Sequence, residues 1–314
     1  MTKLLENHSP GEEYKGYLLV KSAQNGITVK GDPFISLTLG DPSGTVDAKI
    51  WDAKPADEVT FASGVVVKIH GTIIDYQGTK QIRIVSIHPT DEHDNISAHQ
   101  LLPQSNMPVE QSKSIIEQVI KIIKNPNIQL ITRSIMMKYH NDFYQFPAAA
   151  RVHHATAGGL AEHTATMLLN AEGIQRQYKD LNTDLLYAGI ILHDVCKVEE
   201  YKSVIDPDIT LKGQMLGHLN MMAIEISDIA RTIGLNQNSE EVILLQHMVL
   251  SHHGIPEWGS STRPLLKEAQ LLHFIDNIDA KMNTIGTVLN QTEPGEFGEK
   301  HWALDGRRFY RPTI

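Results

Sequence analysis

The first hundred residues alternate between hydrophobic and polar positions in the manner of β-strands. Residues 35–39 place Ile and Leu at every second position, and after a turn at 41–44 residues 46–50 do the same with Val, Ala and Ile. A second pair of such runs covers 65–74 and 82–87. Alternation with a period of two, bounded by Gly, Pro and Asp, predicts strands. Five or so short strands favour a small barrel or sandwich.

The pattern changes after a polar, proline-broken stretch, which we expect to be a linker. Hydrophobic positions then recur with helical spacing, beginning with the isoleucine-rich face of 115–123. Helices interrupted by Pro and Gly are predicted from there onward. The expected organisation is an N-terminal all-β barrel at 1–90, a linker at 91–108, an all-α domain at 109–292 and a C-terminal tail at 293–314.

Composition and charge narrow the class of protein. A chain of 314 residues, 41% hydrophobic and 21% charged, suits a soluble globular protein of two domains. We find no apolar run near the roughly 18 residues that cross a bilayer and no signal-peptide pattern, so we expect a cytoplasmic protein with no membrane partner. The single cysteine, Cys196, fits a reducing compartment. A formal charge of −9 means that any nucleic-acid contact needs a local groove or bound metal.

His193 and Asp194 stand side by side in an otherwise apolar stretch at 185–197. Burying an imidazole beside a carboxylate is costly unless both have a partner, and a divalent cation is one strong candidate. Further candidate ligands precede and follow the pair at helix-sized intervals: His163, His218, His252, His253 and Asp276. Histidine nitrogen combined with aspartate oxygen suits a divalent metal, and seven ligands are enough for two ions.

Each of these residues also has a plain structural interpretation. The chain contains 16 histidines, so chance neighbours are expected. Taken alone, His218 can be interpreted as a structural histidine of the core or surface instead of a metal ligand. Asp276 can likewise be interpreted as a residue near a helix end. His252 and His253 are equally well a loop pair. The order of the whole set, rather than any member, favours a metal centre.

The order His … His-Asp … His … His-His … Asp resembles that of HD-domain metal-dependent phosphohydrolases that hold two metals. Residues 193–197 resemble the family signature HDxxK, and 158–163 resemble the approach to its first ligand. The resemblance implies one metal on His163, His193, Asp194 and Asp276, and a second on Asp194, His218, His252 and His253, with Asp194 bridging. It also implies that Lys197 faces the phosphate, the alternative being a solvated lysine. Mixed His and Asp ligands favour Mn²⁺, with Fe²⁺, Co²⁺ or Mg²⁺ as alternatives.

Residues 34–52 resemble the first hairpin of OB-fold nucleic-acid-binding domains, whose exposed aromatic and cationic side chains contact single-stranded bases. The candidate contacts are Phe34, Lys49, Trp51, Tyr76, Lys80 and Arg83. The alternative for Phe34 and Trp51 is that their side chains fill the barrel interior. Upstream of the first metal ligand, Arg151, His153 and His154 are candidates for holding substrate phosphate, or else surface or helix-start residues.

An OB-like domain followed by an HD domain is similar to the YhaM family of bacterial 3′→5′ exoribonucleases. The likeness includes residues 153–164, 192–197, 250–254 and 276–282. It implies a metal-dependent enzyme that hydrolyses single-stranded RNA to nucleoside 5′-monophosphates, with single-stranded DNA as a second candidate substrate. Asp194 and Lys197 are the expected catalytic residues.

Three rival functions stay open. A cyclic-dinucleotide phosphodiesterase of the HD-GYP type is disfavoured, since residues 254–259 read Gly-Ile-Pro-Glu-Trp-Gly and lack Gly-Tyr-Pro. A nucleotide phosphohydrolase would use the barrel for regulation. A non-catalytic RNA-binding module would hold metal for structure alone. The Arg- and aromatic-containing tail is interpreted as a docked or frayed terminus, or as a contact with RNA or with a second subunit of a homo-oligomer.

Overall fold

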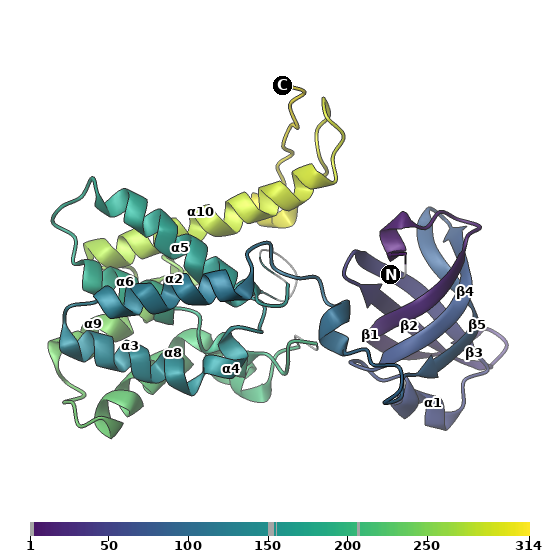
Figure 1. Ribbon diagram of the computed structural model, residues 1–314, viewed down its shortest axis with the longest axis horizontal. Helices are drawn as coiled ribbons and strands as arrows, with labels where there is room; N and C mark the ends of the chain where they lie inside the picture. The colour runs from purple at the N-terminus through teal and green to yellow at the C-terminus, as the bar shows by residue number, and fades with distance from the viewer. Residues whose placement is uncertain (1–2, 150–153, 155, 206–207) are drawn as a thin grey trace. The chain divides into compact units, whose positions relative to one another are not determined.

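The computed structural model describes residues 3–149, 154, 156–205 and 208–314. The chain divides into two compact units. One holds the residues up to Gln104 together with Ile205, and the other begins at Ser105. Strands build the first unit and helices build the second (Figure 1), which confirms the predicted fold class of a β-barrel followed by an all-α domain.

The first unit is a closed five-stranded barrel in the order β1-β2-β3-β5-β4. Its elements are β1 (Glu13–Ile27), β2 (Pro33–Asp41), β3 (Gly44–Trp51), the short helix α1 (Pro55–Thr60), β4 (Val66–Tyr76) and β5 (Thr79–Pro89). Alternate positions face the core: Ile35, Leu37 and Leu39 are each at most 2% exposed. β2 and β3 pair as an antiparallel hairpin, and β3 pairs with β5 in parallel.

The second unit packs its helices around α6. The α-helices are α2 (Val109–Ile122), α3 (Pro126–Lys138), α4 (His140–Phe143), α5 (Gly159–Gln175), α6 (Thr183–Leu192), α7 (Lys197–Glu200), α8 (Leu211–Thr232), α9 (Glu240–Ser251) and α10 (Lys267–Asn290). α6 contacts α2, α3, α5, α9 and α10 (Figure 1), and every residue from Leu185 to Leu192 is buried. The polar residues that follow α6 therefore emerge in the middle of the unit.

Beyond α10 the chain folds back on itself. Phe297 pairs with Tyr310, and the Arg311 guanidinium donates hydrogen bonds to the carbonyl oxygens of Leu289 and Thr292, which satisfy the end of α10. The tail is thus docked on α10. In the part of the chain that the structure describes, no helix combines the length and the hydrophobicity needed to cross a bilayer.

Candidate metal centre

His193 and Asp194 follow the last residue of α6 and are enclosed by the helices around it. His193 has no exposed surface and Asp194 is 3% exposed. Behind them lies Cys196, 1% exposed, whose Sγ contacts Sδ of Met222 at 3.7 Å. An apolar helix that ends inside the unit thus delivers a polar pair to a site that water hardly reaches.

Four more segments bring the other predicted ligands to this pair. His163 comes from α5, His218 from α8, His252 and His253 from the end of α9, and Asp276 from α10. The ligand atoms of His163, His193 and Asp276 lie within 4.8 Å of one another, as do those of His193, Asp194 and His252, and those of His218, His252 and His253. The overlapping groups join all seven residues into one cluster.

Asp194 lies between two sets of histidines. Its Oδ2 atom is 3.2 Å from Nε2 of His193, and its Oδ1 atom is 3.1 Å from Nε2 of His218 and 3.7 Å from Nε2 of His252. A carboxylate that turns one oxygen to each side is the arrangement needed to bridge two cations.

The five histidines of the cluster share one orientation. In each, Nδ1 donates a hydrogen bond to an oxygen atom, so Nε2, which faces the cluster, is the nitrogen that can offer its lone pair to a metal. The acceptors are Asp279 for His163 at 2.6 Å, Ile190 for His193 at 2.7 Å, Glu200 for His218 at 2.9 Å, Val249 for His252 at 2.7 Å and Trp258 for His253 at 2.7 Å. Metal-ligating histidines are held in this way.

Several inward-facing atoms lack the partners that burial demands. Among the described residues, Nε2 of His193, Nε2 of His218 and Oδ1 of Asp194 are buried and make no hydrogen bond of acceptable geometry. Leaving such atoms unsatisfied is expensive. Divalent cations accept both imidazole nitrogen and carboxylate oxygen, so the donor set fits them.

Electrostatic interactions keep the carboxylates of the cluster ionised. Burial opposes the charge of Asp194, but His193 and Lys197 hold its pKa well below the usual range. Asp276 behaves alike, because His163 lowers its pKa against the effect of burial. Burial and the neighbouring His253 lower the pKa of His252, which favours the neutral imidazole that a metal requires.

A second layer of carboxylates lies behind two of the histidines. Oδ2 of Asp279 accepts hydrogen bonds from Nδ1 of His163 at 2.6 Å and from Nε2 of His154 at 2.8 Å. Glu200 accepts from Nδ1 and from the backbone N–H of His218. Asp279 and Glu200 were not among the predicted site residues. Their spacing in the sequence could have identified them. Asp279 lies one helical turn after Asp276, and Glu200 lies one helical turn after Lys197.

Comparison with known proteins agrees with this geometry. The HD domain family matches residues 160–281, a range that includes all seven clustered residues. The 3′-5′ exoribonuclease YhaM of Bacillus subtilis (strain 168) is 44% identical over 314 residues, which cover 100% of this chain and 99% of that protein. The chain belongs to the YhaM family. YhaM of Geobacillus sp. (strain WCH70) is likewise 44% identical, covering 100% of this chain and 96% of that protein.

Solved structures resemble the barrel only weakly. A domain of replication protein A from Methanococcus maripaludis is 17% identical to this YhaM-family chain and covers 29% of it and 97% of the domain, with a TM-score of 0.25.

Lys197 is buried at the start of α7 rather than solvated. Its Nζ atom donates to Oδ2 of Asp194 at 2.6 Å and to the carbonyl oxygen of Ala148 at 2.7 Å. It also lines a cavity of about 220 Å³, whose wall includes Asp194, Asp276 and Asn277. Lys197 in this member of the YhaM family thus touches both the metal centre and the space in front of it.

Of the three candidates upstream of α5 for holding substrate phosphate, the structure describes His154. His154 is 5% exposed, and its ring lies between Glu162 at 3.1 Å and Asp279 at 2.8 Å. Its imidazole thus supports the layer behind His163. Arg151 and His153 lie outside the described residues.

The barrel of this YhaM-family chain presents aromatic and cationic side chains on its outer surface. The rings of Phe34 and Trp51 are 5.5 Å apart, and Nζ of Lys49 lies 5.0 Å and 5.3 Å from their centroids. Trp51 is 58% exposed, so it does not fill the barrel. Arg83 lies on the adjacent strand β5, one residue beyond the pairing of Ala48 with Ile82, and is exposed as Lys49 is.

Two other barrel candidates lie apart from that group. Tyr76 is 57% exposed at the turn between β4 and β5. Nζ of Lys80 donates to the carbonyl oxygens of Leu5 and His8, so its amine ties down the N-terminal segment. We call Phe34, Lys49, Trp51 and Arg83 the barrel patch.

Proposed function

We propose that this chain is a two-metal 3′→5′ exoribonuclease that removes nucleoside 5′-monophosphates from single-stranded RNA, with single-stranded DNA as a second candidate substrate. One observation carries the proposal: five clustered imidazoles, four of them buried, are each held by an oxygen atom on Nδ1, and Nε2 of three of them, His193, His218 and His252, lies within 3.7 Å of Asp194. The full-length relatives named 3′-5′ exoribonuclease supply the polymer and its polarity.

The ligands divide into two sets that share Asp194. His163, His193, Asp194 and Asp276 would hold one cation, and Asp194, His218, His252 and His253 would hold the other. The proximity of the ligand atoms supports this division. The nitrogen and oxygen donors favour Mn²⁺, with Fe²⁺, Co²⁺ or Mg²⁺ as alternatives. When bound, such a pair of cations polarises a phosphate oxygen and makes water nucleophilic at neutral pH.

The protein contributes position and charge to this chemistry. Asp194 presents Oδ2 to His193 and Oδ1 to His218, so it would be shared by the two cations. Lys197 orients Asp194, and among the described residues two of its three N–H groups are taken, which leaves the third for a phosphate oxygen in the cavity. The barrel patch binds the strand by stacking bases on Phe34 and Trp51, with Lys49 and Arg83 beside the phosphates.

Two rival activities predict different preferred substrates. A cyclic-dinucleotide phosphodiesterase or a nucleotide phosphohydrolase would prefer its small substrate to an RNA oligomer. Turnover of an RNA 20-mer, a cyclic dinucleotide and a nucleoside triphosphate therefore separates the three. We expect the RNA to be preferred.

The test of the proposed centre uses RNA labelled at its 5′ end and protein reconstituted with Mn²⁺. The wild type should shorten the RNA from the far end, and Asp194→Ala should slow this at least about a hundredfold, since the cations contribute several kcal/mol to the reaction. His93→Ala, at an exposed histidine of the linker, is the matched control. Unchanged hydrolysis by Asp194→Ala would remove this cluster as the catalytic site.

A further inference from the structure

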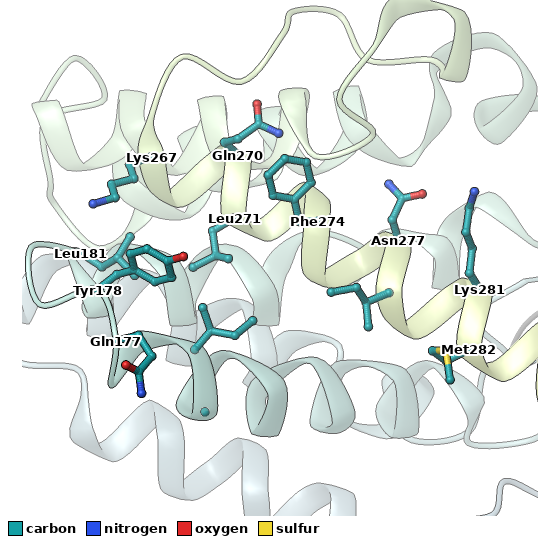
Figure 2. Close-up of a pocket in the computed structure, with 13 residues that line it drawn as sticks. Gln177, Tyr178, Leu181, Lys267, Gln270, Leu271, Phe274, Asn277, Lys281 and Met282 are labelled. Atoms are coloured by element: carbon teal, nitrogen blue, oxygen red, sulfur yellow. The ribbon is translucent and has the colours of Figure 1, made fainter.

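A groove of about 1,070 Å³ runs along α10, opposite the end of α5 and the loop that follows it. Its floor is apolar, and two aromatic rings, Tyr178 and Phe274, stand in it with 53% of each residue exposed. Figure 2 shows Tyr178 near Leu271, with Phe274 further along α10. Exposed aromatic and aliphatic surface of this extent calls for a ligand.

The groove adjoins the catalytic cavity. Asn277 lines both, and on either side of it α10 places Asp276 in the cavity wall and Lys281 in the groove. The cavity, at about 220 Å³, is smaller than the roughly 300–1,000 Å³ of pockets that enclose a drug-sized ligand. It is therefore large enough only for the reacting end of a polymer. The adjacent nucleotides of the strand must lie on the neighbouring surface.

The chemistry of the groove suits a single nucleic-acid strand. Among the described residues that line it none is acidic, although the chain has 37 acidic and 28 basic residues. Lys267 and Lys281 lie in it, and each contacts a carboxylate, Asp180 at 2.6 Å and Asp305 at 3.7 Å, whose side chains are 74% and 70% exposed. Exposed ion pairs are weak, so a phosphate can replace either carboxylate.

We propose that this groove binds the RNA nucleotides adjacent to the reacting 3′ end, with bases stacked on Tyr178 and Phe274 and phosphates near Lys267 and Lys281. Stacking on aromatic faces tolerates every base, as an exonuclease requires. The inference rests on the proposed function, because it takes the RNA end to lie in the cavity beside Asn277.

The kinetic test compares a long and a short substrate on the full-length protein with Mn²⁺. Phe274→Ala and Tyr178→Ala should each raise KM for a 12-nucleotide RNA roughly five- to 150-fold, the effect of losing one base stack. Hydrolysis of bis(p-nitrophenyl) phosphate, which reaches only the cavity, should stay within about twofold of wild type. Ile243→Ala, at a residue of α9 that is 51% exposed and outside the groove, should change neither.

A binding test needs no catalysis. RNA carrying 4-thiouridine at the third nucleotide from the 3′ end is irradiated with the protein in EDTA, and the crosslinked peptides are mapped. Crosslinks within residues 173–181 or 267–282 support the proposal. An unchanged KM in both variants, or crosslinks elsewhere, would overturn it.

Two further outcomes are distinguishable. A fall in molar mass by light scattering in Phe274→Ala, with KM for RNA unchanged, would assign the groove to a second copy of the chain and overturn the proposal. A wild type that hydrolyses neither substrate would refute the proposed function, whereas the crosslinking would still report on the groove.

Discussion

Asp279 contacts two buried imidazoles, those of His154 and His163, with one oxygen atom, and it reaches the metal centre through His163. A carboxylate on the far nitrogen fixes the tautomer of a ligating histidine and makes its ring a stronger donor. The residue is therefore a positioning group, and its loss should affect metal binding before it affects the fold.

Asp279→Asn should weaken metal binding about 10- to 100-fold, as replacing the partner of a ligating histidine typically does. Competition between the protein and a fluorescent chelator for Mn²⁺ measures the change. Asp228→Asn, at a carboxylate of the exposed surface paired with Arg231, is the matched control. Equal affinity in the two variants would show that Asp279 does not act on His163.

His163 also makes metal binding sensitive to pH. Burial opposes its charge, but hydrogen bonds to Asp276 and Asp279 raise its pKa from 6.5 to about 10 in the metal-free protein. A cation requires the neutral ring, so binding at pH 7 should release about one proton from this site and tighten as the pH rises. Calorimetry in two buffers of different ionisation enthalpy measures the release; no release would contradict the prediction.

The same shift affects stability without metal. A raised pKa stabilises the folded protein fully below the unfolded value near 6.5 and loses that effect as the pH approaches about 10. The Tm of the metal-free wild type should therefore fall over this range more steeply than that of His163→Gln. Parallel pH profiles of the two proteins would exclude His163 as the source.

Helix α8 is broken just before its ligand. Gly217 has φ 71° and ψ 152° between two helical segments. The second segment begins at His218, whose N–H is accepted by Glu200. Glycine is needed here because other residues rarely adopt such a backbone, and the break lets α8 turn so that His218 faces Asp194.

Gly217→Ala should cost about 1–3 kcal/mol through backbone strain alone, since a Cβ at this position meets no atom within 4 Å. If the helix relieves the strain by straightening, His218 moves and the second cation is lost. Metal analysis should then give about one ion per chain instead of two. Gly286→Ala in α10, also with open space but without positive φ, should keep both ions and is the control.

The elements show what a sequence pattern can reveal. Strict alternation identified the four strands β2 to β5, which are buried on one face. β1 escaped notice because Leu18, Leu19 and Val20 are all buried and a bulge follows Val20, so its alternation is lost. The stretch expected as linker contains a short 3₁₀ helix, Ala98–Leu101, which is too brief to show periodicity.

The same limit applies to the site residues. The metal ligands were recognisable for two reasons. Histidine and aspartate are costly to bury in apolar helices unless they have a partner, and here they follow the order typical of HD domains. Asp279, Glu162 and Glu200 were not recognisable, since an acidic residue on a helix is ordinarily a solvated one. Their burial depends on neighbours from distant segments, which no local pattern encodes.

Each unit has its own hydrophobic core, one inside the barrel and one around α6. Because the cores are separate, we expect residues 1–104 and 105–314 to fold as separate proteins. The first should bind single-stranded RNA in a salt-dependent manner, and the second should retain both metals and hydrolyse bis(p-nitrophenyl) phosphate.

Trp51→Ala in residues 1–104 should weaken RNA binding roughly five- to 150-fold, the effect of losing one stacked base. Val59→Ala, at a residue of α1 that is 79% exposed, is the control. Binding that is equal in the two variants, measured by fluorescence anisotropy, would rule out the barrel patch as the RNA-binding surface.

Cys196 lies two residues after Asp194, and burial raises the pKa of its thiol to about 12. A disulfide reagent can attack it only after the helices around α6 separate. The rate at which a disulfide reagent labels Cys196 thus reports how often these helices open. No second cysteine competes for the reagent, because the chain has only one. Saturating Mn²⁺ should therefore slow the labelling of Cys196.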